Sequence, residues 1–261
     1  MTRIIAIANQ KGGVGKTTTA VNLAASLSAT RRRVLLVDLD AQGNATMGVG
    51  VDKSAVAKTC RDLLLEKATT LEVIQNLPKL GFDLIPANGD MTEAEIRLRE
   101  MPVGDFALKS ALSEVADRYD FILLDCPPAL SKLTVNALVA ADSVLIPMQC
   151  EYYALEGLSA LVDTVNRIRK LINPKLEIEG LVRTMFDPRN NLANDVSAQL
   201  TQHFGDKVYR TIVPRNVRLA EAPSHGLPAM IYDFDCPGAR AYITLAGEML
   251  RRHDGGQQRL S

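Results

Sequence analysis

The chain has 261 residues, of which 47% are hydrophobic and 23% are charged. This balance is typical of a globular protein with a sizeable core and excludes a disordered chain. The 30 basic and 30 acidic residues cancel, so net charge selects no partner and any anionic surface must be met by a local patch. The four cysteines (Cys60, Cys126, Cys150 and Cys236) include no C-x-x-C pair, which argues against a zinc site or a disulfide framework and favours a reducing cytoplasm.

Short apolar runs alternate with longer helical segments along the chain. The predicted strands are residues 4–8, 34–37, 82–86, 121–124, 143–147, 179–184 and 208–213. The segments 17–29, 105–118, 131–141, 154–172 and 190–204 are long enough to be crossover helices. Apolar runs of this length are typical of strands buried on both faces, and their alternation with helices predicts right-handed βαβ units. The expected fold is α/β, with a mostly parallel, twisted sheet covered by helices on both faces.

No linker or internal repeat divides the chain. Residues 1–253 are therefore expected to form a single domain, and residues 254–261 a disordered tail. The chain enters its first strand within a few residues and contains no uninterrupted apolar stretch of about 18 residues, so neither a signal peptide nor a membrane span is expected. Ligands of such sheets bind beyond the carboxyl ends of the strands, so the residues that follow the strands matter most for chemistry.

The segment after the first strand, Lys-Gly-Gly-Val-Gly-Lys-Thr-Thr, predicts a phosphate-binding loop. Its glycines allow a tight turn whose N–H groups point into one concavity, and the following helix adds its positive end. Lys16 supplies a charge for the outer phosphates, and the Thr17 hydroxyl is placed to bind Mg²⁺. A nucleoside triphosphate is the expected ligand. The predicted cradle comprises Lys11, Gly12, Gly13, Val14, Gly15, Lys16, Thr17 and Thr18.

Carboxylates end two further predicted strands. Asp38 and Asp40 follow the strand over 34–37, and Asp125 follows the strand over 121–124. A carboxylate at a strand tip beside a phosphate loop lies where Mg²⁺ and its waters need a hard oxygen. Each aspartate taken alone could instead be a surface carboxylate or a helix cap. The neighbouring phosphate loop favours the metal-site interpretation.

The phosphate loop departs from the pattern G-x-x-x-x-G-K-[ST], because Gln10 stands at the first glycine position and Lys11 adds a second lysine. In this deviant P-loop the chain resembles the ParA/MinD group of ATPases. The segments NQKGGVGKTTTAVNLA, VLLVDLDAQGNAT, LLDCPP, IPMQCEYYALEGL and VPRNVRLAEAPSHG extend the resemblance over nearly the whole chain. Together they look like the chromosomal ParA, or Soj-like, partition ATPases, so a P-loop NTPase domain is expected.

The resemblance implies a DNA-partition switch that hydrolyses ATP with Mg²⁺. In such proteins an ATP-bound sandwich homodimer binds double-stranded DNA without sequence preference. Hydrolysis, stimulated by a ParB-type centromere-binding protein, then releases the dimer and drives segregation of a chromosome or plasmid. A cytoplasmic, nucleoid-associated protein without membrane attachment is implied. The chain begins at its first strand, without the helix-turn-helix of the large plasmid members, so operator binding is not expected.

The resemblance also implies roles for individual residues around the phosphate loop. Lys11 would reach across the dimer to touch the partner's phosphates and would be catalytic together with Lys16 and Asp40. Asp40 would orient the attacking water. Asp125 looks like the Walker B aspartate, and Thr17, Asp38 and Asp125 would form the metal site.

Other residue roles implied by the resemblance lie late in the chain. Pro214 and Asn216 are expected to hold the adenine, since an amide offers both a donor and an acceptor; without the resemblance Asn216 reads as a turn residue. Arg189 and Arg218 are expected to contact DNA phosphates. On composition alone, the basic residues of this region are explained by a solvated charge run. The segment 151–156 is expected on the dimer surface.

Alternatives from other functional classes make different demands on the sequence. A MinD-like membrane-cycling or cargo-positioning ATPase shares the deviant loop, but the tail RRHDGGQQRLS offers no hydrophobic face to a lipid surface. A relative of nitrogenase iron protein needs cysteines for a shared cluster, and no Cys-Gly-Gly follows Asp125. A non-enzymatic nucleotide sensor does not need the proposed water-orienting carboxylate of Asp40. An assay of ATP turnover distinguishes such a sensor from an ATPase.

Overall fold

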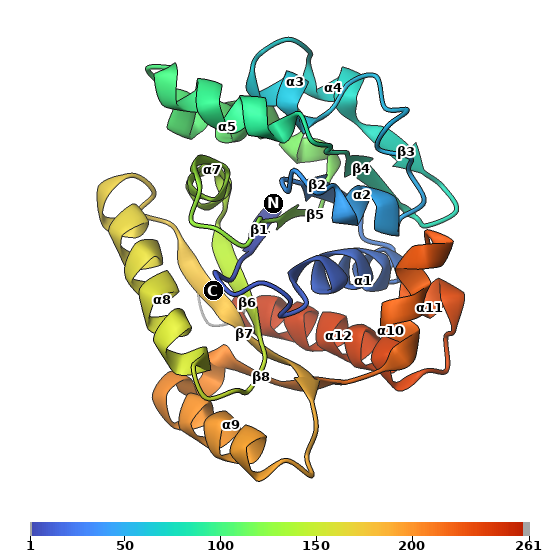
Figure 1. The fold of residues 1–261 in the computed structure, drawn as a ribbon, viewed down its shortest axis with the longest axis vertical. Helices are drawn as coiled ribbons and strands as arrows, with labels where there is room; N and C mark the ends of the chain where they lie inside the picture. The colour runs from blue at the N-terminus through green and yellow to red at the C-terminus, as the bar shows by residue number, and fades with distance from the viewer. Residues whose placement is uncertain (1, 258–261) are drawn as a thin grey trace.

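An eight-stranded sheet with the order β3-β4-β2-β5-β1-β6-β7-β8 forms the centre of the computed structural model, which describes residues 2–257 (Figure 1). Its strands are β1 (Arg3–Ile7), β2 (Val34–Asp38), β3 (Gln75–Leu77), β4 (Phe82–Ile85), β5 (Phe121–Asp125), β6 (Ser143–Met148), β7 (Glu177–Phe186) and β8 (Val208–Pro214). Neighbouring strands pair in parallel, except that β3 is antiparallel to β4. The predicted α/β fold with a mostly parallel sheet is confirmed. The short strand β3 has no counterpart among the predicted strands.

The helices connect these strands and cover the sheet. They are α1 (Lys16–Ala29), α2 (Asn44–Gly48), α3 (Cys60–Leu64), α4 (Thr70–Val73), α5 (Met91–Glu100), α6 (Ala107–Ser113), α7 (Lys132–Ala140), α8 (Ala154–Leu171), α9 (Asn191–Phe204), α10 (Val217–Glu221), α11 (Ala229–Tyr232) and α12 (Pro237–Gln257). Short 3₁₀ turns are η1 (Gly104–Phe106), η2 (Ala116–Arg118), η3 (Gly205–Lys207) and η4 (Ala222–His225).

Two predictions differ from the structure: one helix and the disordered tail. The helix predicted over 105–118 is divided into η1, α6 and η2, and α6 is separated from η2 at the fully buried Val115, which leaves the helical conformation at φ −125° and ψ 0°. At the carboxyl end, α12 continues to Gln257, so residues 254–257 of the predicted tail are helical. Residues 258–261 of that tail lie outside the described residues.

Side chains of the central strands alternate between two hydrophobic cores, as the period of a strand requires. Ile5, Leu36 and Leu123 belong to the core on the face covered by α1 and α12. The adjacent residues Ala6 and Leu35 belong to the core on the opposite face, which α5, α7 and α8 cover (Figure 1). Burial on both faces explains why the strands appear in the sequence as continuous apolar runs.

The sheet order brings the ends of three strands together at the middle of the molecule. β1 lies between β5 and β6, and β2 lies on the other side of β5. Asp125 pairs in register with Ile7 on one side and with Asp38 on the other. The loop that follows β1 therefore emerges beside two carboxylates, at the edge where ligands of parallel sheets bind.

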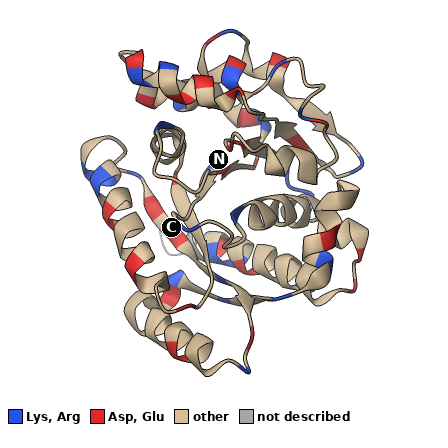
Figure 2. Cartoon of the chain, in the orientation of Figure 1, with Lys and Arg blue, Asp and Glu red and all other residues tan. Residues whose placement is uncertain are grey.

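Charged residues of both signs are spread over the helices and loops (Figure 2), in keeping with the formal net charge of zero. Within the described part of the chain, none of the helices combines the length and the apolar character needed to cross a membrane.

Candidate nucleotide site

The loop between β1 and α1 has the backbone conformation that its glycines predict. Gly13 and Gly15 have φ values of +73° and +88°, and Gly15 is the N-cap of α1. Side chains with a Cβ rarely adopt this left-handed region. A Cβ added at Gly12 or Gly13 would meet no heavy atom within 4 Å, so the loop borders open space. The Thr184 hydroxyl of β7 donates to the Val14 carbonyl (2.7 Å) and ties the loop to the sheet.

The two lysines of the loop have different surroundings. Lys16 is buried, and its ammonium donates to the Lys11 carbonyl (3.0 Å) inside the loop. Burial lowers the pKa of Lys16, while the charges of Asp125 and Asp40 oppose this shift. The Lys11 side chain is 42% exposed and forms an ion pair with Glu151. Lys16 is thus directed into the loop, and Lys11 is directed away from it.

Asp125, at the end of β5, is a fully buried carboxylate. Neither of its oxygens has a partner of normal hydrogen-bond geometry among the described residues. Burial and the neighbouring Asp38 raise its pKa well above the ordinary range, and the nearby Thr17 hydroxyl and Lys16 ammonium act in the opposite direction. An unpaired buried carboxylate is costly. A divalent cation or its bound water would supply the missing partner, so the residues present fit Mg²⁺.

Asp38 is equally buried, but both of its carboxylate oxygens accept hydrogen bonds from neighbouring residues. It accepts hydrogen bonds from the Thr46 N–H (2.9 Å), the Thr46 hydroxyl (2.7 Å) and the Asp40 N–H (3.1 Å). Burial nevertheless raises its pKa to about 6. The Thr46 hydroxyl also accepts from the Ala87 N–H (2.9 Å). Asp38 therefore anchors α2 and the loop that carries Asp40, and its place in a metal site stays a prediction.

Asp40 lies at the more open end of this loop. It is partly exposed, and its Oδ1 accepts from the Gln42 N–H (3.0 Å). Its charge acts on both Lys16 and Asp125, so the loop after β2 brings Asp40 to the phosphate loop and the buried carboxylate. Asp40 is therefore more accessible to solvent than the fully buried Asp38 and Asp125.

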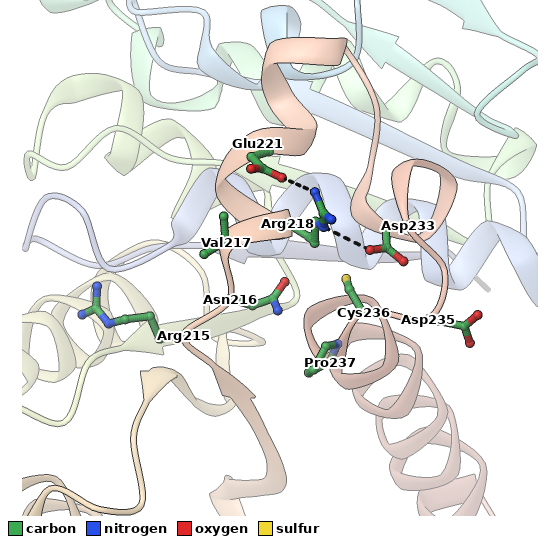
Figure 3. Close-up of a pocket in the computed structure, with 9 residues that line it drawn as sticks. All are labelled: Arg215, Asn216, Val217, Arg218, Glu221, Asp233, Asp235, Cys236 and Pro237. Carbon is green, nitrogen blue, oxygen red and sulfur yellow. Dashed lines mark hydrogen bonds and ion pairs between the residues drawn. The ribbon is translucent and has the colours of Figure 1, made fainter.

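Asn216 begins α10 and faces an open cleft of about 650 Å³ (Figure 3). Its Oδ1 accepts from the Leu219 N–H (3.3 Å), which makes it the N-cap of the helix. Pro214, at the end of β8, lies in register with Phe186 of β7. The side-chain oxygen of Asn216 thus has the local role expected of a turn residue. Its amide nitrogen takes no part in the helix cap. Residues that line the cleft are Arg215, Asn216, Val217, Arg218, Glu221, Asp233, Asp235, Cys236 and Pro237.

Both arginines that the sequence predicts to contact DNA are paired with carboxylates of the same chain. Arg218 donates to Glu221 (2.8 Å) and Asp233 (3.2 Å), as Figure 3 shows. The Arg189 side chain is 88% exposed and makes a two-point contact with Asp187 (2.9 and 2.8 Å). A phosphate bound by either arginine would therefore compete with a carboxylate of the same chain.

Several residues that shape the site were not among the predicted site residues. Glu151, in the segment after β6, pairs with Lys11, and Thr184 of β7 donates to the Val14 carbonyl. The Asn9 side-chain oxygen accepts a hydrogen bond from the Lys11 N–H (3.0 Å), and its amide nitrogen donates to the Pro147 carbonyl (2.8 Å). Thr46 holds Asp38. Glu151 and Thr184 come to the loop only through the strand order, so the spacing of motifs along the chain could not reveal them. Asn9 and Thr46 lie close in sequence to Lys11 and Asp38, so their positions were the available signal.

Comparison with known proteins identifies the family. A family model described as an AAA domain matches residues 2–178. The chain is 51% identical over 249 residues to the sporulation initiation inhibitor protein Soj of Bacillus subtilis, covering 95% of this chain and 98% of that protein. It is 47% identical over 252 residues to the chromosome partitioning protein ParA of Caulobacter vibrioides, covering 96% and 94% of the two chains. The chain belongs to the ParA/Soj family of partition ATPases.

The ParA/Soj fold is shared with proteins named for other reactions. A structure of cobyrinic acid a,c-diamide synthase from Mycobacterium smegmatis, with bound ATP analogue and magnesium, is 34% identical and has a TM-score of 0.86. The match covers 98% of this chain and 97% of that one. The ParA/Soj assignment follows from the higher identity to the partition proteins, and the prediction of a P-loop ATPase is confirmed.

Proposed function

We propose that this protein is an ATP-hydrolysing switch for DNA partition. Its ATP-bound sandwich homodimer binds double-stranded DNA without sequence preference, and hydrolysis stimulated by a ParB-type partner releases it. The observation that supports this most directly is the different placement of the two loop lysines. Lys16 fills the role of the usual P-loop lysine, whereas Lys11 points out of its own loop toward Glu151. A second lysine placed in this way suits a phosphate bound by another copy of the chain.

The nucleotide would be held by the backbone of residues 12–18 and by the Lys16 ammonium. Thr17 and Asp125 would hold Mg²⁺, and Asp38 would support them from behind. When bound, the cation neutralises charge on the phosphate oxygens and helps to align them. The unpartnered oxygens of Asp125 support this assignment.

Hydrolysis would depend on groups aimed at the outer phosphate. Asp40, partly exposed beside the loop, would orient the attacking water. Lys16 and a partner's Lys11 would stabilise the charge that develops on the phosphate oxygens. Pro214 and Asn216 would hold the adenine beside the cleft. Arg189 and Arg218 would contact DNA phosphates after releasing their carboxylates.

The decisive experiment separates nucleotide binding, dimerisation and turnover. Asp40→Ala should still bind ATP and should sediment as a dimer with ATP, while turnover falls by about 10²- to 10⁴-fold because a water-positioning group is lost. Lys16→Ala should instead lose ATP binding. Gly12→Val should bind ATP and remain a monomer, because a branched side chain would occupy the open face of the loop. A monomeric Asp40→Ala protein at every ATP concentration would refute the sandwich dimer.

A further inference from the structure

The carboxyl end of β7 reaches the phosphate loop although the two are not neighbours in the sheet. β6 separates β7 from β1, and the pairing of β6 with β7 ends at Met148 and Arg183. β6 itself ends at Met148, whereas β7 continues to Phe186. The last three residues of β7 therefore extend past β6, and this overhang brings Thr184 to the loop that follows β1.

Thr184 is buried, and its side chain meets the loop in two ways. The hydroxyl donates to the carbonyl of Val14 (2.7 Å), a residue that is also buried. The Thr184 Cβ and methyl group lie 3.8 Å from the point where Gly15 would carry a Cβ, which is ordinary van der Waals contact. A buried carbonyl needs a donor, and this donor comes from a residue 170 positions later in the chain. The folded sheet thus acts directly on the middle of the loop.

The backbone next to Thr184 is held in an unusual conformation. Met185 has a φ of +48°, a left-handed value that residues other than glycine seldom adopt because their Cβ is crowded. Its Sδ lies 2.9 Å from Gln149 Nε2, and its Cε lies 3.8 Å from the same Gly15 position. Strain of this kind persists only where the surrounding structure holds it, and it is concentrated at functional sites.

The contact between Thr184 and Val14 fixes the direction of a hydrogen-bond donor in the loop. The Val14 carbonyl and the Gly15 N–H belong to one planar trans peptide group, so they point in opposite directions. A carbonyl held toward β7 therefore turns the Gly15 N–H away from β7. Gly15 has a φ of +88° and is the N-cap of α1, so its N–H lies at the positive end of that helix. An N–H fixed in this place can meet an anion without rearrangement of the loop.

We propose that Thr184 is a positioning residue of the nucleotide site: through the Val14 carbonyl it holds the Gly15 N–H toward the phosphates of ATP or ADP. The inference rests on the proposed placement of the nucleotide in the phosphate loop. Thr184 itself does not touch the nucleotide in this arrangement. It favours binding because a loop whose donor already points at the phosphate needs no reordering. Thr184 should therefore set nucleotide affinity and leave the chemical step nearly unchanged.

The test measures binding of a non-hydrolysable ATP analogue and of ADP to the full chain, with Mg²⁺, by isothermal titration calorimetry. Thr184→Val keeps the shape of the side chain and removes the hydroxyl. Affinity for both nucleotides should fall about tenfold, as expected when one hydrogen bond to a charged group is misaligned. The KM for ATP should rise by a similar factor, while kcat stays within about threefold of the parent, because Thr184 touches no reacting atom. Thr184→Ser keeps the hydroxyl and should retain the parental affinity within about twofold.

Thr70→Val is the matched control for the loss of a buried hydroxyl. Thr70 is fully buried, and its hydroxyl donates to the Ala111 carbonyl over the same distance, 2.7 Å, between α4 and α6. Urea denaturation should show a loss of stability in both valine variants, because each leaves a buried carbonyl without its donor. The Thr70 variant should nevertheless keep the parental nucleotide affinity. If Thr184→Val does not fold, Thr184→Ala and Thr184→Ser give the same comparison without and with the hydroxyl.

Parental affinity in Thr184→Val would overturn the proposal, as would an equal loss of affinity in Thr184→Ser or in Thr70→Val. Lys16→Ala separates this inference from the proposed function. If Lys16→Ala binds ATP as tightly as the parent, the nucleotide does not occupy the loop and the proposed function fails with this inference. If Lys16→Ala loses ATP binding while Thr184→Val keeps it, this inference fails alone.

Discussion

Two buried carboxylates lie side by side at the centre of the sheet and differ in what surrounds them. Asp38 accepts three hydrogen bonds from the chain, whereas Asp125 accepts none of normal geometry from the described residues. Burial raises the pKa of both groups. The same residue type therefore stabilises the fold at position 38 and opposes it at position 125. Retention of the less favourable aspartate is expected where a ligand completes its environment.

Asp125→Asn should stabilise the nucleotide-free protein while removing activity. Loss of an unpaired buried charge should raise the free energy of unfolding by about 1–3 kcal/mol, measured by urea denaturation. Mg²⁺-dependent ATP turnover should fall by at least about 10²-fold, since a direct charge on the metal shell is lost.

Asp38→Asn is the matched control for this substitution. It should lower the free energy of unfolding, because an amide cannot accept all of the hydrogen bonds from Thr46 and Asp40. Equal destabilisation by the two substitutions would show that the Asp125 carboxylate already has a partner within the protein and would contradict its assignment to a cation site.

At the scale of elements, the end of α12 is fastened to the sheet through one glutamate. Glu179 of β7 accepts from the Ser143 hydroxyl (2.7 Å) and the Tyr209 hydroxyl (3.0 Å), and its Oε1 lies 2.8 Å from His253 Nε2. Burial alone would raise its pKa, but the contacts with His253, Ser143 and Tyr209 outweigh burial and lower the pKa to about 2. One side chain thus joins β6, β7, β8 and α12.

This cluster predicts a pH dependence of stability. A carboxyl whose pKa falls from about 4.3 in the unfolded chain to about 2 in the fold stabilises the protein at pH values above the unfolded pKa. The contribution, about 3 kcal/mol from about 1.4 kcal/mol per pKa unit, is lost as the pH falls from about 4.5 toward 2. Glu179→Gln should therefore lower the free energy of unfolding at pH 7 and make the acid limb less steep.

Glu177→Gln on the same strand is the control, because the Glu177 side chain is 70% exposed and its carboxylate lies 3.7 Å from the Lys207 ammonium. Urea denaturation at several pH values between 3 and 7 gives the comparison. An unchanged acid limb in the Glu179 variant would contradict the assigned role.

The elements that sequence predicts best are those buried on both faces. The runs 4–8 and 121–124 became β1 and β5 nearly as expected, because central parallel strands must be apolar throughout. β3 (Gln75–Leu77) is short and partly exposed, so it leaves no such run. The phosphate loop was predictable because its residues are contiguous. Glu151 and Thr184 were not, since only the sheet order brings them to the loop.

At the scale of the whole molecule, Arg189 and Arg218 follow β7 and β8 at the carboxyl edge of the sheet, and each is paired with a carboxylate. If the ATP dimer binds DNA through Arg189 and Arg218, the double alanine variant should flatten the salt dependence by up to about 3.6, from four contacts at about 0.9 each. ATP binding should be unchanged. The measurement uses the Asp40→Ala background with ATP, so that turnover does not release the DNA.

Glu221→Gln provides the opposite change, because it frees Arg218 from one of its carboxylates. DNA affinity with ATP should rise by about two- to fivefold, as expected for removal of an exposed ion pair. Unchanged affinity in both the arginine and the glutamate variants would place the ATP-dependent DNA contact elsewhere.

The packing of α1 against α12 has a consequence for biosynthesis. The helix that carries the phosphate loop shares its core with the last helix of the chain, and the Thr19 and Tyr242 hydroxyls meet there at 3.0 Å. Strands β2 and β5 cover one part of α1 early in translation, but the part that faces α12 stays uncovered until Pro237–Gln257 has left the ribosome. An interrupted chain keeps this surface open to chaperones and proteases. We expect a chain that lacks Pro237–Gln257 to be less stable, because the part of α1 that faces α12 is then left exposed to water.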